Sequence, residues 1–236
     1  MGFHRGGRTI TDSLCFYFDA LNKKSYSGSG IIFKDLFSKA EGVTILGPTQ
    51  TIGLVNNHLL FNCDGVSRSC YISFPITEIT LPTGSTGSWA WSQYFIDSGD
   101  ISHQNFGNST ANGGFCFRTG WGLDGPRWGI GGVWYNIYEL SIPSRYKQNQ
   151  WQHYTVTFNG NVANGLKTYL NGILVDERTP TVSIIGSTPK DLWVGADPYS
   201  GGNWNGYQDT VQIWLNELTN NQVLQNYNAT KSRFGL

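Results

Sequence analysis

The chain has 236 residues, with 30 glycines, 14% aromatic residues and only 14% charged residues. Its 16 basic residues balance 16 acidic ones, which argues against a nucleic-acid-binding protein, because such proteins depend on a basic surface. The apolar fraction of 39% at zero net charge argues against a disordered chain. No apolar run approaches the roughly 20 residues that cross a bilayer.

In chain order, the first predicted element is an extended arm over residues 1–13, which lack periodicity, followed by a single domain over 14–236. The domain contains short runs of aromatic, β-branched and alternating residues, separated by frequent Gly and Asn turn signals. Strands are expected at LCFYFDA, HLLFNCDG, CYISFP, SWAWSQYFI, RWGIGGVWYNIYEL, QHYTVTF, DLWVGAD and YQDTVQIW.

Two local signals in the second half are stronger than the rest. In TYLNGILV, Asn171 and Gly172 stand where a type I′ turn needs two residues at positive φ, which predicts a hairpin. Thr219 and Gln222 form a capping-box pattern ahead of VLQNYNA, which predicts one short helix packed on the rim of a sheet. Many short strands with one helix indicate an all-β sandwich or barrel.

The four cysteines and the first residues bear on the compartment. No CxxC pair occurs, which argues against a zinc site. The residues MGFHRGGRTITDS are followed by no apolar core of a signal peptide, so we expect synthesis and folding in a cytoplasm. Cys15, Cys63, Cys70 and Cys116 lie beside apolar residues, as buried free thiols do. Cys63 and Cys70 could instead pair across a loop, although a reducing compartment disfavours that bond.

Four stretches resemble a known family: FDALNKKSYSGSG with FKDL, FNCDGVSRSCYISFP, WQHYTVTFNGN with LKTYLNGILVDE, and LWVGADPYSGGNWNGYQDTVQIWLNELTNNQVLQNYNATKSRFG. They are similar to the concanavalin A-like lectin/glucanase superfamily, in its laminin-G-like branch. The resemblance implies a two-sheet antiparallel jelly roll with a short C-terminal helix. The closing segment, together with RGGRTITDSLCFYFDA, resembles a subgroup of virion structural proteins of tailed phages.

The resemblance does not extend to catalysis. Glucanases of this superfamily carry a Glu-x-Asp-x-x-Glu or Glu-x-Asp-x-Glu run, because glycoside hydrolysis uses two carboxyl groups flanking the scissile bond. Here the glutamates are isolated from one another, and no Gly-x-Ser-x-Gly nucleophile elbow precedes a helix. We therefore expect a protein that is not an enzyme.

A structural calcium ion is a further implication of the resemblance. Family members often tie the first strand to the last through an ion that an Asp on the closing strand binds. Asp209 in QDTVQIW matches that position, and Asp19 or Asp64 could lie nearby. In the family's closing pattern, Ile-Asp-Glu-Val-Arg-Ile-Tyr, this chain keeps the Asp but lacks the Glu and the Arg. The alternative is that Asp209 binds a neighbouring loop without metal.

Two loops combine aromatic rings with amide and carboxyl groups, as sugar-binding sites do. Because nine tryptophans exceed what the core requires, some are expected to be partly exposed. Strand tryptophans are assigned to the core: Trp89, Trp91, Trp134, Trp151, Trp193 and Trp214. The loop residues are candidates for carbohydrate binding or for contact with neighbouring subunits: Trp121, Asp124, Arg127, Trp128, Asp197, Tyr199, Asn203 and Trp204.

These features favour a non-enzymatic protein on the surface of a tailed-phage virion, a head decoration or a tail or fibre component. Its expected partners are other virion proteins, further copies of itself and cell-surface or environmental glycans. The basic residues His4, Arg5 and Arg8 suit an arm that docks on a particle protein. The alternative is a pure assembly module that binds capsid or tail subunits and no sugar; a glycan depolymerase is the third reading.

Overall fold

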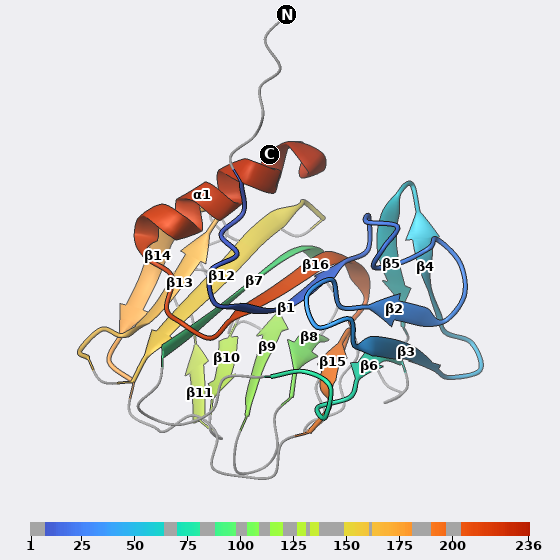
Figure 1. The fold of residues 1–236 in the computed structure, drawn as a ribbon, viewed down its shortest axis with the longest axis horizontal. Coiled ribbons are helices and arrows are strands. Elements are labelled where there is room, and N and C mark those ends of the chain that lie inside the picture. Colours follow the sequence, from blue (N-terminus) through green and yellow to red (C-terminus); the bar gives the residue numbers. More distant parts are fainter. Residues whose placement is uncertain are drawn as a thin grey trace, which may run out of the picture.

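The computed structural model describes residues 8–63, 70–80, 88–97, 103–108, 114–119, 127–130, 133–136, 149–160, 162–180, 190–196 and 204–236. Two eight-stranded antiparallel sheets form the molecule (Figure 1). The predicted all-β jelly-roll sandwich is therefore confirmed. Among the described residues, no helix has the length and apolar character needed to cross a bilayer.

Sheet A carries the helix and both ends of the described chain. Its strands follow the order β14-β13-β12-β7-β16-β5-β4, and β1 pairs with β16 beside that path. Their bounds are β1 (Leu14–Asp19), β4 (Thr51–Val55), β5 (His58–Asn62), β7 (Ser88–Asp97), β12 (Gln152–Asn159), β13 (Leu166–Leu170), β14 (Ile173–Arg178) and β16 (Gly206–Trp214).

Sheet B packs against sheet A in the order β11-β10-β9-β8-β15-β6-β3-β2. Its strands are β2 (Ile32–Lys34), β3 (Glu41–Leu46), β6 (Cys70–Phe74), β8 (His103–Gly107), β9 (Phe115–Thr119), β10 (Arg127–Ile130), β11 (Val133–Asn136) and β15 (Leu192–Val194).

The main core lies between the two sheets and follows the two-residue period of the strands. On β6, Cys70, Ile72 and Phe74 are fully buried, while Tyr71 and Ser73 alternate with them on the outer face. Phe16 and Phe74 meet edge to face with ring centroids 5.0 Å apart. Burial of such rings supplies roughly 25 cal/mol for each Å² of apolar surface removed from water.

A second, smaller cluster lies between sheet A and the helix α1 (Asn220–Thr230), which runs across β12, β13 and β14 (Figure 1). The predicted capping box is confirmed, since the Thr219 side chain accepts from the Gln222 backbone N–H. The predicted hairpin is confirmed as well, with Asn171 at φ 51° and Gly172 at φ 79°. A single 3-10 turn, η2 (Lys231–Phe234), follows the helix.

The residues before β1 are bound to α1. The Ile10 backbone N–H donates to Asn226 Oδ1 at 2.7 Å, and Trp214 Nε1 donates to the Ile10 carbonyl at 2.9 Å. Gln225 Nε2 donates to the Arg8 carbonyl at 2.7 Å. Arg8 and Ile10 thus lie against α1 and β16. His4 and Arg5 lie outside the described residues.

The expectation for the cysteines is confirmed for one pair and wrong for the other. Cys15 and Cys116 are buried free thiols. Cys63 and Cys70 instead form a disulfide, with their Cα atoms 5.9 Å apart. This bond joins the end of β5 in sheet A to the start of β6 in sheet B. Folding places the two thiols side by side where the chain crosses between sheets, which the local sequence does not reveal.

Candidate functional site

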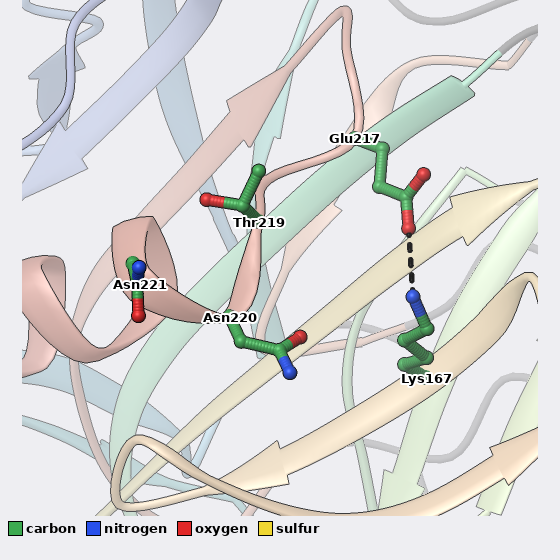
Figure 2. A pocket seen from close by; sticks show the side chains of 5 residues that line it. All are labelled: Lys167, Glu217, Thr219, Asn220 and Asn221. Carbon is green, nitrogen blue, oxygen red and sulfur yellow. Dashed lines mark hydrogen bonds and ion pairs between the residues drawn. The ribbon is translucent and has the colours of Figure 1, made fainter.

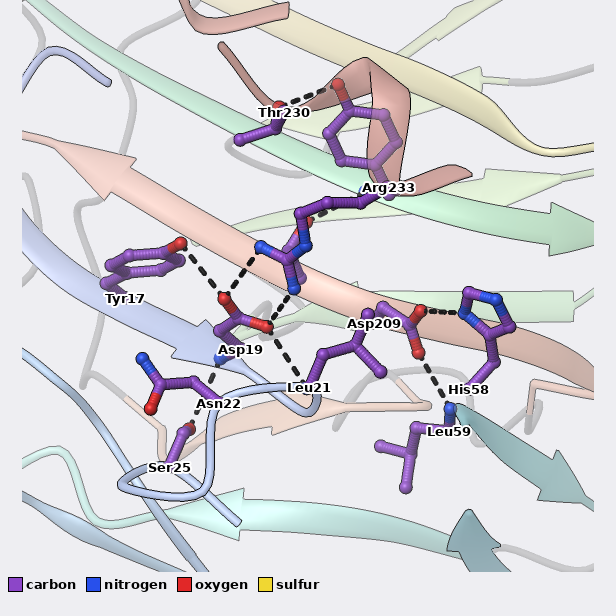
Figure 3. A network of polar contacts seen from close by, with 12 residues as sticks. Tyr17, Asp19, Leu21, Asn22, Ser25, His58, Leu59, Asp209, Thr230 and Arg233 are labelled. Carbon is purple, nitrogen blue, oxygen red and sulfur yellow. Dashed lines mark hydrogen bonds and ion pairs between the residues drawn. The ribbon is translucent and has the colours of Figure 1, made fainter. Parts of the chain in front are cut away.

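The predicted calcium ligands Asp19 and Asp209 lie in neighbouring strands, β1 and β16, within one polar network (Figure 3). Asp19 is 3% exposed. Its Oδ1 accepts from Arg233 Nη2 at 2.7 Å, and its Oδ2 accepts from Arg233 Nη1 at 2.9 Å. The backbone N–H of Leu21 and the hydroxyl of Tyr17 also donate to this carboxylate, each at 3.1 Å. A guanidinium therefore already neutralises Asp19.

Asp209 is fully buried and has its own donors. Its Oδ1 accepts from the Leu59 backbone N–H at 2.7 Å, and its Oδ2 is bonded to His58 Nδ1. Burial raises the pKa of Asp209 to about 6, although the hydrogen bonds from His58 and Leu59 act against this shift. The sequence alternative is that Asp209 binds a neighbouring loop without metal; its partners His58 and Leu59 instead belong to the strand β5.

These residues do not fit calcium. The ion takes 6–8 oxygen ligands, but N–H and O–H donors already occupy the oxygens of both carboxylates. Among the described residues, no three His, Cys, Asp or Glu side chains converge on a metal-sized site. Asp64, the third predicted ligand, lies outside the described residues.

The network instead fastens the end of the chain to sheet A. Arg233 and Phe234 belong to η2, and the Phe234 ring stacks on Tyr94 with centroids 3.9 Å apart. The Trp151 ring also contacts Phe234, with centroids 4.8 Å apart. The Tyr94 hydroxyl is also within 2.8 Å of Thr230 Oγ1. Sequence reasoning missed this role for Arg233, because its partner lies 214 residues away.

A polar pocket of about 530 Å³ opens beside the start of α1 (Figure 2). Lys167 Nζ donates to Glu217 Oε1 at 3.3 Å, and Tyr169 donates to Asn220 Oδ1 at 2.6 Å. The hydroxyl of Thr219 caps the helix. Most of these polar groups thus already have a hydrogen-bond partner. The residues that line the pocket include no aromatic ring: Lys167, Glu217, Thr219, Asn220 and Asn221.

Most of the predicted sugar-binding residues fall outside the described part of the chain: Trp121, Asp124, Asp197, Tyr199 and Asn203. Arg127 and Trp128 lie on β10, where only the backbone is described. The prediction that Trp204 is an exposed sugar-binding ring is wrong, because Trp204 is 0% exposed and belongs to the main core. Its backbone N–H donates to the Gly195 carbonyl at 2.6 Å, which holds the chain against β15 and turns the indole inward.

A stacked aromatic pair lies instead on the outer face of sheet B. Trp193 stands between Leu192 and Val194, which are both fully buried, so the pleat turns its side chain away from the core. Tyr71 projects from β6 on the same face, and its ring stacks on Trp193 with centroids 3.8 Å apart and planes 15° apart. Both side chains are half-buried. The assignment of Trp193 to the core is therefore wrong, whereas Trp214 is fully buried as expected.

Exposed aliphatic side chains continue this surface across the neighbouring strands. Ile32 pairs with Val43, Val43 with Ser73, and Ser73 with Trp193, so the four positions form one row. Ile45 pairs with Tyr71 in the adjacent row. Ile32 is 39%, Val43 37% and Ile45 38% exposed. We call the surface formed by Ile32, Val43, Ile45, Tyr71 and Trp193 the outer-sheet patch.

Polar groups border the outer-sheet patch at β15. Asp191 Oδ2 accepts from the Ser73 hydroxyl at 3.2 Å, and its Oδ1 accepts from the Ile76 backbone N–H at 3.1 Å. Burial and the charge of Asp191 both raise the pKa of Tyr71. An apolar face with a hydroxyl and a carboxylate at its edge can hold a ligand that is itself part apolar and part hydroxylated.

Comparisons with known proteins agree with this fold. Residues 68–224, more than half of the chain, match the family described as Concanavalin A-like lectin/glucanases superfamily. No curated protein sequence matches the chain. Domain 4 of AbnA, a GH43 extracellular arabinanase from Geobacillus stearothermophilus solved in complex with arabinotriose, superposes with a TM-score of 0.63 at 16% identity. That match covers 91% of this chain and 98% of the other.

Two further structures share the fold within longer proteins. The botulinum neurotoxin serotype D binding domain has a TM-score of 0.63 at 18% identity, over 92% of this chain and 51% of that one. The Trypanosoma rangeli sialidase in complex with sialic acid has a TM-score of 0.62 at 13% identity, over 96% of this chain and 34% of that one. The chain thus spans about half of the first and a third of the second.

Proposed function

Because the chain belongs to the concanavalin A-like lectin/glucanases superfamily, we propose that it is a non-catalytic carbohydrate-binding module whose ligand lies on the outer-sheet patch. One observation carries this proposal: the half-buried Tyr71 and Trp193 rings stack on each other on the outer face of sheet B, away from the core. The arabinotriose-bound arabinanase domain, which this chain matches over nearly its whole length, is consistent with such a role.

The chemistry of the patch suits a sugar. A saccharide ring presents an apolar C–H face that covers an aromatic ring and removes apolar surface from water. Its hydroxyl groups, which lie around the ring edge, need polar partners to offset their lost hydration. Ser73 and Asp191 stand beside the rings and offer a hydroxyl and carboxylate oxygens. The patch therefore combines the two kinds of contact that fix a sugar in one orientation.

The carboxylates in the described part of the chain favour binding over cleavage. Glycosidases place two carboxyl groups about 5 Å or 6.5–9.5 Å apart across the scissile bond. Among the described residues, one carboxyl group lies beside the stacked rings, that of Asp191. Glu41 on the same face is paired with Lys34 at 2.7 Å. Asp19 and Asp209 are buried with partners of their own.

We further propose that the module is displayed on the surface of a tailed-phage virion, bound to other virion proteins. The support is the resemblance of the opening and closing segments to virion structural proteins. The Cys63–Cys70 disulfide agrees with it, because disulfides persist on virion surfaces and not in a reducing cytoplasm. Many copies on one particle would turn weak single-site binding into useful avidity. Mass spectrometry of purified particles tests this location, and absence of the protein from them would refute it.

The binding test replaces the ring that the proposal depends on. We expect Trp193→Ala and Tyr71→Ala each to weaken binding of the array glycans that the native protein selects, by roughly 1–2 kcal/mol or about 5- to 30-fold. Isothermal titration of the best array ligand measures the loss. Ile173→Ala, an exposed substitution on β14 of the other sheet, is the matched control and should bind as the native protein does. Unchanged binding in both ring variants would place the ligand elsewhere.

The exposed aliphatic members of the patch support a second candidate, a pure assembly module. Ile32, Val43 and Ile45 form the kind of apolar surface that protein partners cover. In that case the glycan array stays silent for the native protein, and Val43→Lys reduces incorporation of the protein into particles.

A further inference from the structure

We propose that the outer-sheet patch selects neutral saccharides and rejects acidic ones, because Asp191 holds a fixed negative charge beside the stacked rings. This inference rests on the proposed carbohydrate-binding function and assigns its ligand class. The sugars that we expect to bind carry hydroxyl groups alone, and those that we expect to be rejected carry carboxylates or sulfates.

Strand geometry places the charge beside the rings. Asp191 precedes Trp193 by two residues, and residues two apart in an extended chain lie on the same face about 6.6 Å apart. Ser73, which holds Asp191 Oδ2 at 3.2 Å, is also the cross-strand partner of Trp193. A sugar stacked on Trp193 would therefore extend its ring substituents over the Asp191 carboxylate.

The carboxylate cannot easily turn away from a ligand. Its two oxygens are held separately, one by the Ser73 hydroxyl and the other by the Ile76 backbone N–H. Burial, and after it the charge of Asp191, raises the pKa of Tyr71. An anionic sugar would thus meet an ordered negative charge at the edge of its binding surface.

Other described charges around the patch do not cancel that of Asp191. Lys34 and Glu41, which lie two residues from Ile32 and Val43 on the same strands, neutralise each other at 2.7 Å. Lys190 is exposed and precedes Asp191, so it is out of step with the two-residue period that puts Asp191 and Trp193 on one face. Neutral hydroxyl groups, in contrast, can donate to the remaining lone pairs of the carboxylate, and such charge-assisted bonds are about twice as strong as neutral ones.

The experiment compares matched probes on native protein and Asp191→Asn. The probes are neutral oligosaccharides and their uronate or sialylated counterparts of equal length, titrated at low and high salt. We expect the native protein to favour the neutral member of a pair by roughly three- to tenfold at low salt, less at high salt. In Asp191→Asn, which keeps the shape of the side chain, that preference should disappear. Glu41→Gln is the matched charge control and should keep it.

The outcomes separate this inference from the proposed function. If Trp193→Ala abolishes binding but the native protein takes acidic and neutral probes equally, the ligand class is wrong and the binding surface stands. The same holds if Asp191→Asn leaves the preference unchanged. If Trp193→Ala and Tyr71→Ala bind every probe as the native protein does, the proposed site itself fails. Circular dichroism confirms that each variant is folded.

Discussion

Arg233 is the residue on which the C-terminal attachment depends. Its two Nη atoms reach the two oxygens of Asp19, a carboxylate with 5% side-chain exposure, while 30% of the Arg233 side chain remains exposed. Removing one partner of such a pair leaves a charge that is buried and only partly compensated. Removing Arg233 should therefore cost more stability than removing one partner of an ion pair on the surface.

We expect Arg233→Gln to lower the free energy of unfolding by roughly 2–4 kcal/mol, less than a fully buried pair would lose, because water still reaches the guanidinium. Urea titration followed by fluorescence measures it. Lys34→Gln removes a partner of the Lys34–Glu41 pair, whose side chains are 51% and 54% exposed, and should cost under about 1 kcal/mol. Equal losses in the two variants would contradict the role given to Arg233.

His153 gives the protein a predictable response to acid. It is 1% exposed between the rings of Tyr94 and Tyr227, and burial lowers its pKa from 6.5 to about 3. Between these values the unfolded chain binds a proton that the folded chain does not. The stabilisation is therefore complete above pH 6.5 and is lost as the pH falls towards 3, by about 5 kcal/mol at most.

We expect His153→Phe to flatten the acid side of the stability profile relative to the native protein. Urea titrations at intervals between pH 3 and 7 measure the two slopes. Asp209 acts in the opposite direction, because its raised pKa makes the folded state bind the extra proton between pH 3.8 and about 6. Since both proteins contain Asp209, its contribution cancels in the difference. Parallel profiles would show that His153 has the same pKa in the folded and unfolded states and would contradict this prediction.

Among the elements, β5 and β6 are joined by a covalent bond between the two sheets. The Cys63–Cys70 bond closes a loop with a sequence separation of 7. A loop of this length restricts the unfolded chain by roughly 2–3 kcal/mol in the chain-entropy description. We expect the double variant Cys63→Ala/Cys70→Ala to have a free energy of unfolding lower by about that amount than the oxidised native protein. Thermal unfolding measures the difference. Adding reductant should bring the native protein to the level of the variant; a Cys15→Ala variant should still respond to reductant.

Elements with local signals could be predicted from the sequence, whereas their partners could not. The Asn171–Gly172 hairpin and the Thr219 capping box each depend on residues within a few positions of one another. In contrast, β1 pairs with β16 nearly two hundred residues later. The disulfide and the Arg233–Asp19 pair are consequences of such pairings, so no local pattern contains them.

The stacked pair of Tyr71 and Trp193 shows a second limit of the sequence, which does not reveal which face of a strand points to the core. In DLWVGAD, Trp193 alternates with Leu192 and Val194, and either set could face the core. Pairing with β6, where Ile72 and Phe74 point inward, decides the question and turns Trp193 outward. Trp204 follows a Gly- and Asn-rich stretch that is typical of surface loops, yet its indole completes the core. The sequence thus shows that the chain has more tryptophans than the core requires, but it does not show which of the rings are exposed.

The whole molecule has two unlike faces. Sheet A is covered by α1 and η2, and residue 8 and residue 236 both lie on that side (Figure 1). The outer-sheet patch lies on the opposite side, on the far face of sheet B. The sandwich therefore separates the ends of the described chain from the aromatic rings by its full thickness.

This separation fixes how the molecule stands on any support. A tether that leaves from residue 8 or from residue 236 pulls on the helix-covered side, so Tyr71 and Trp193 face away from the support in either case. A layer of such molecules on a bead, a sensor chip or a fibre would be uniformly oriented without any designed contact between neighbours. Grafting the chain by either end should therefore leave its aromatic face accessible to large polymers that could not reach beneath it.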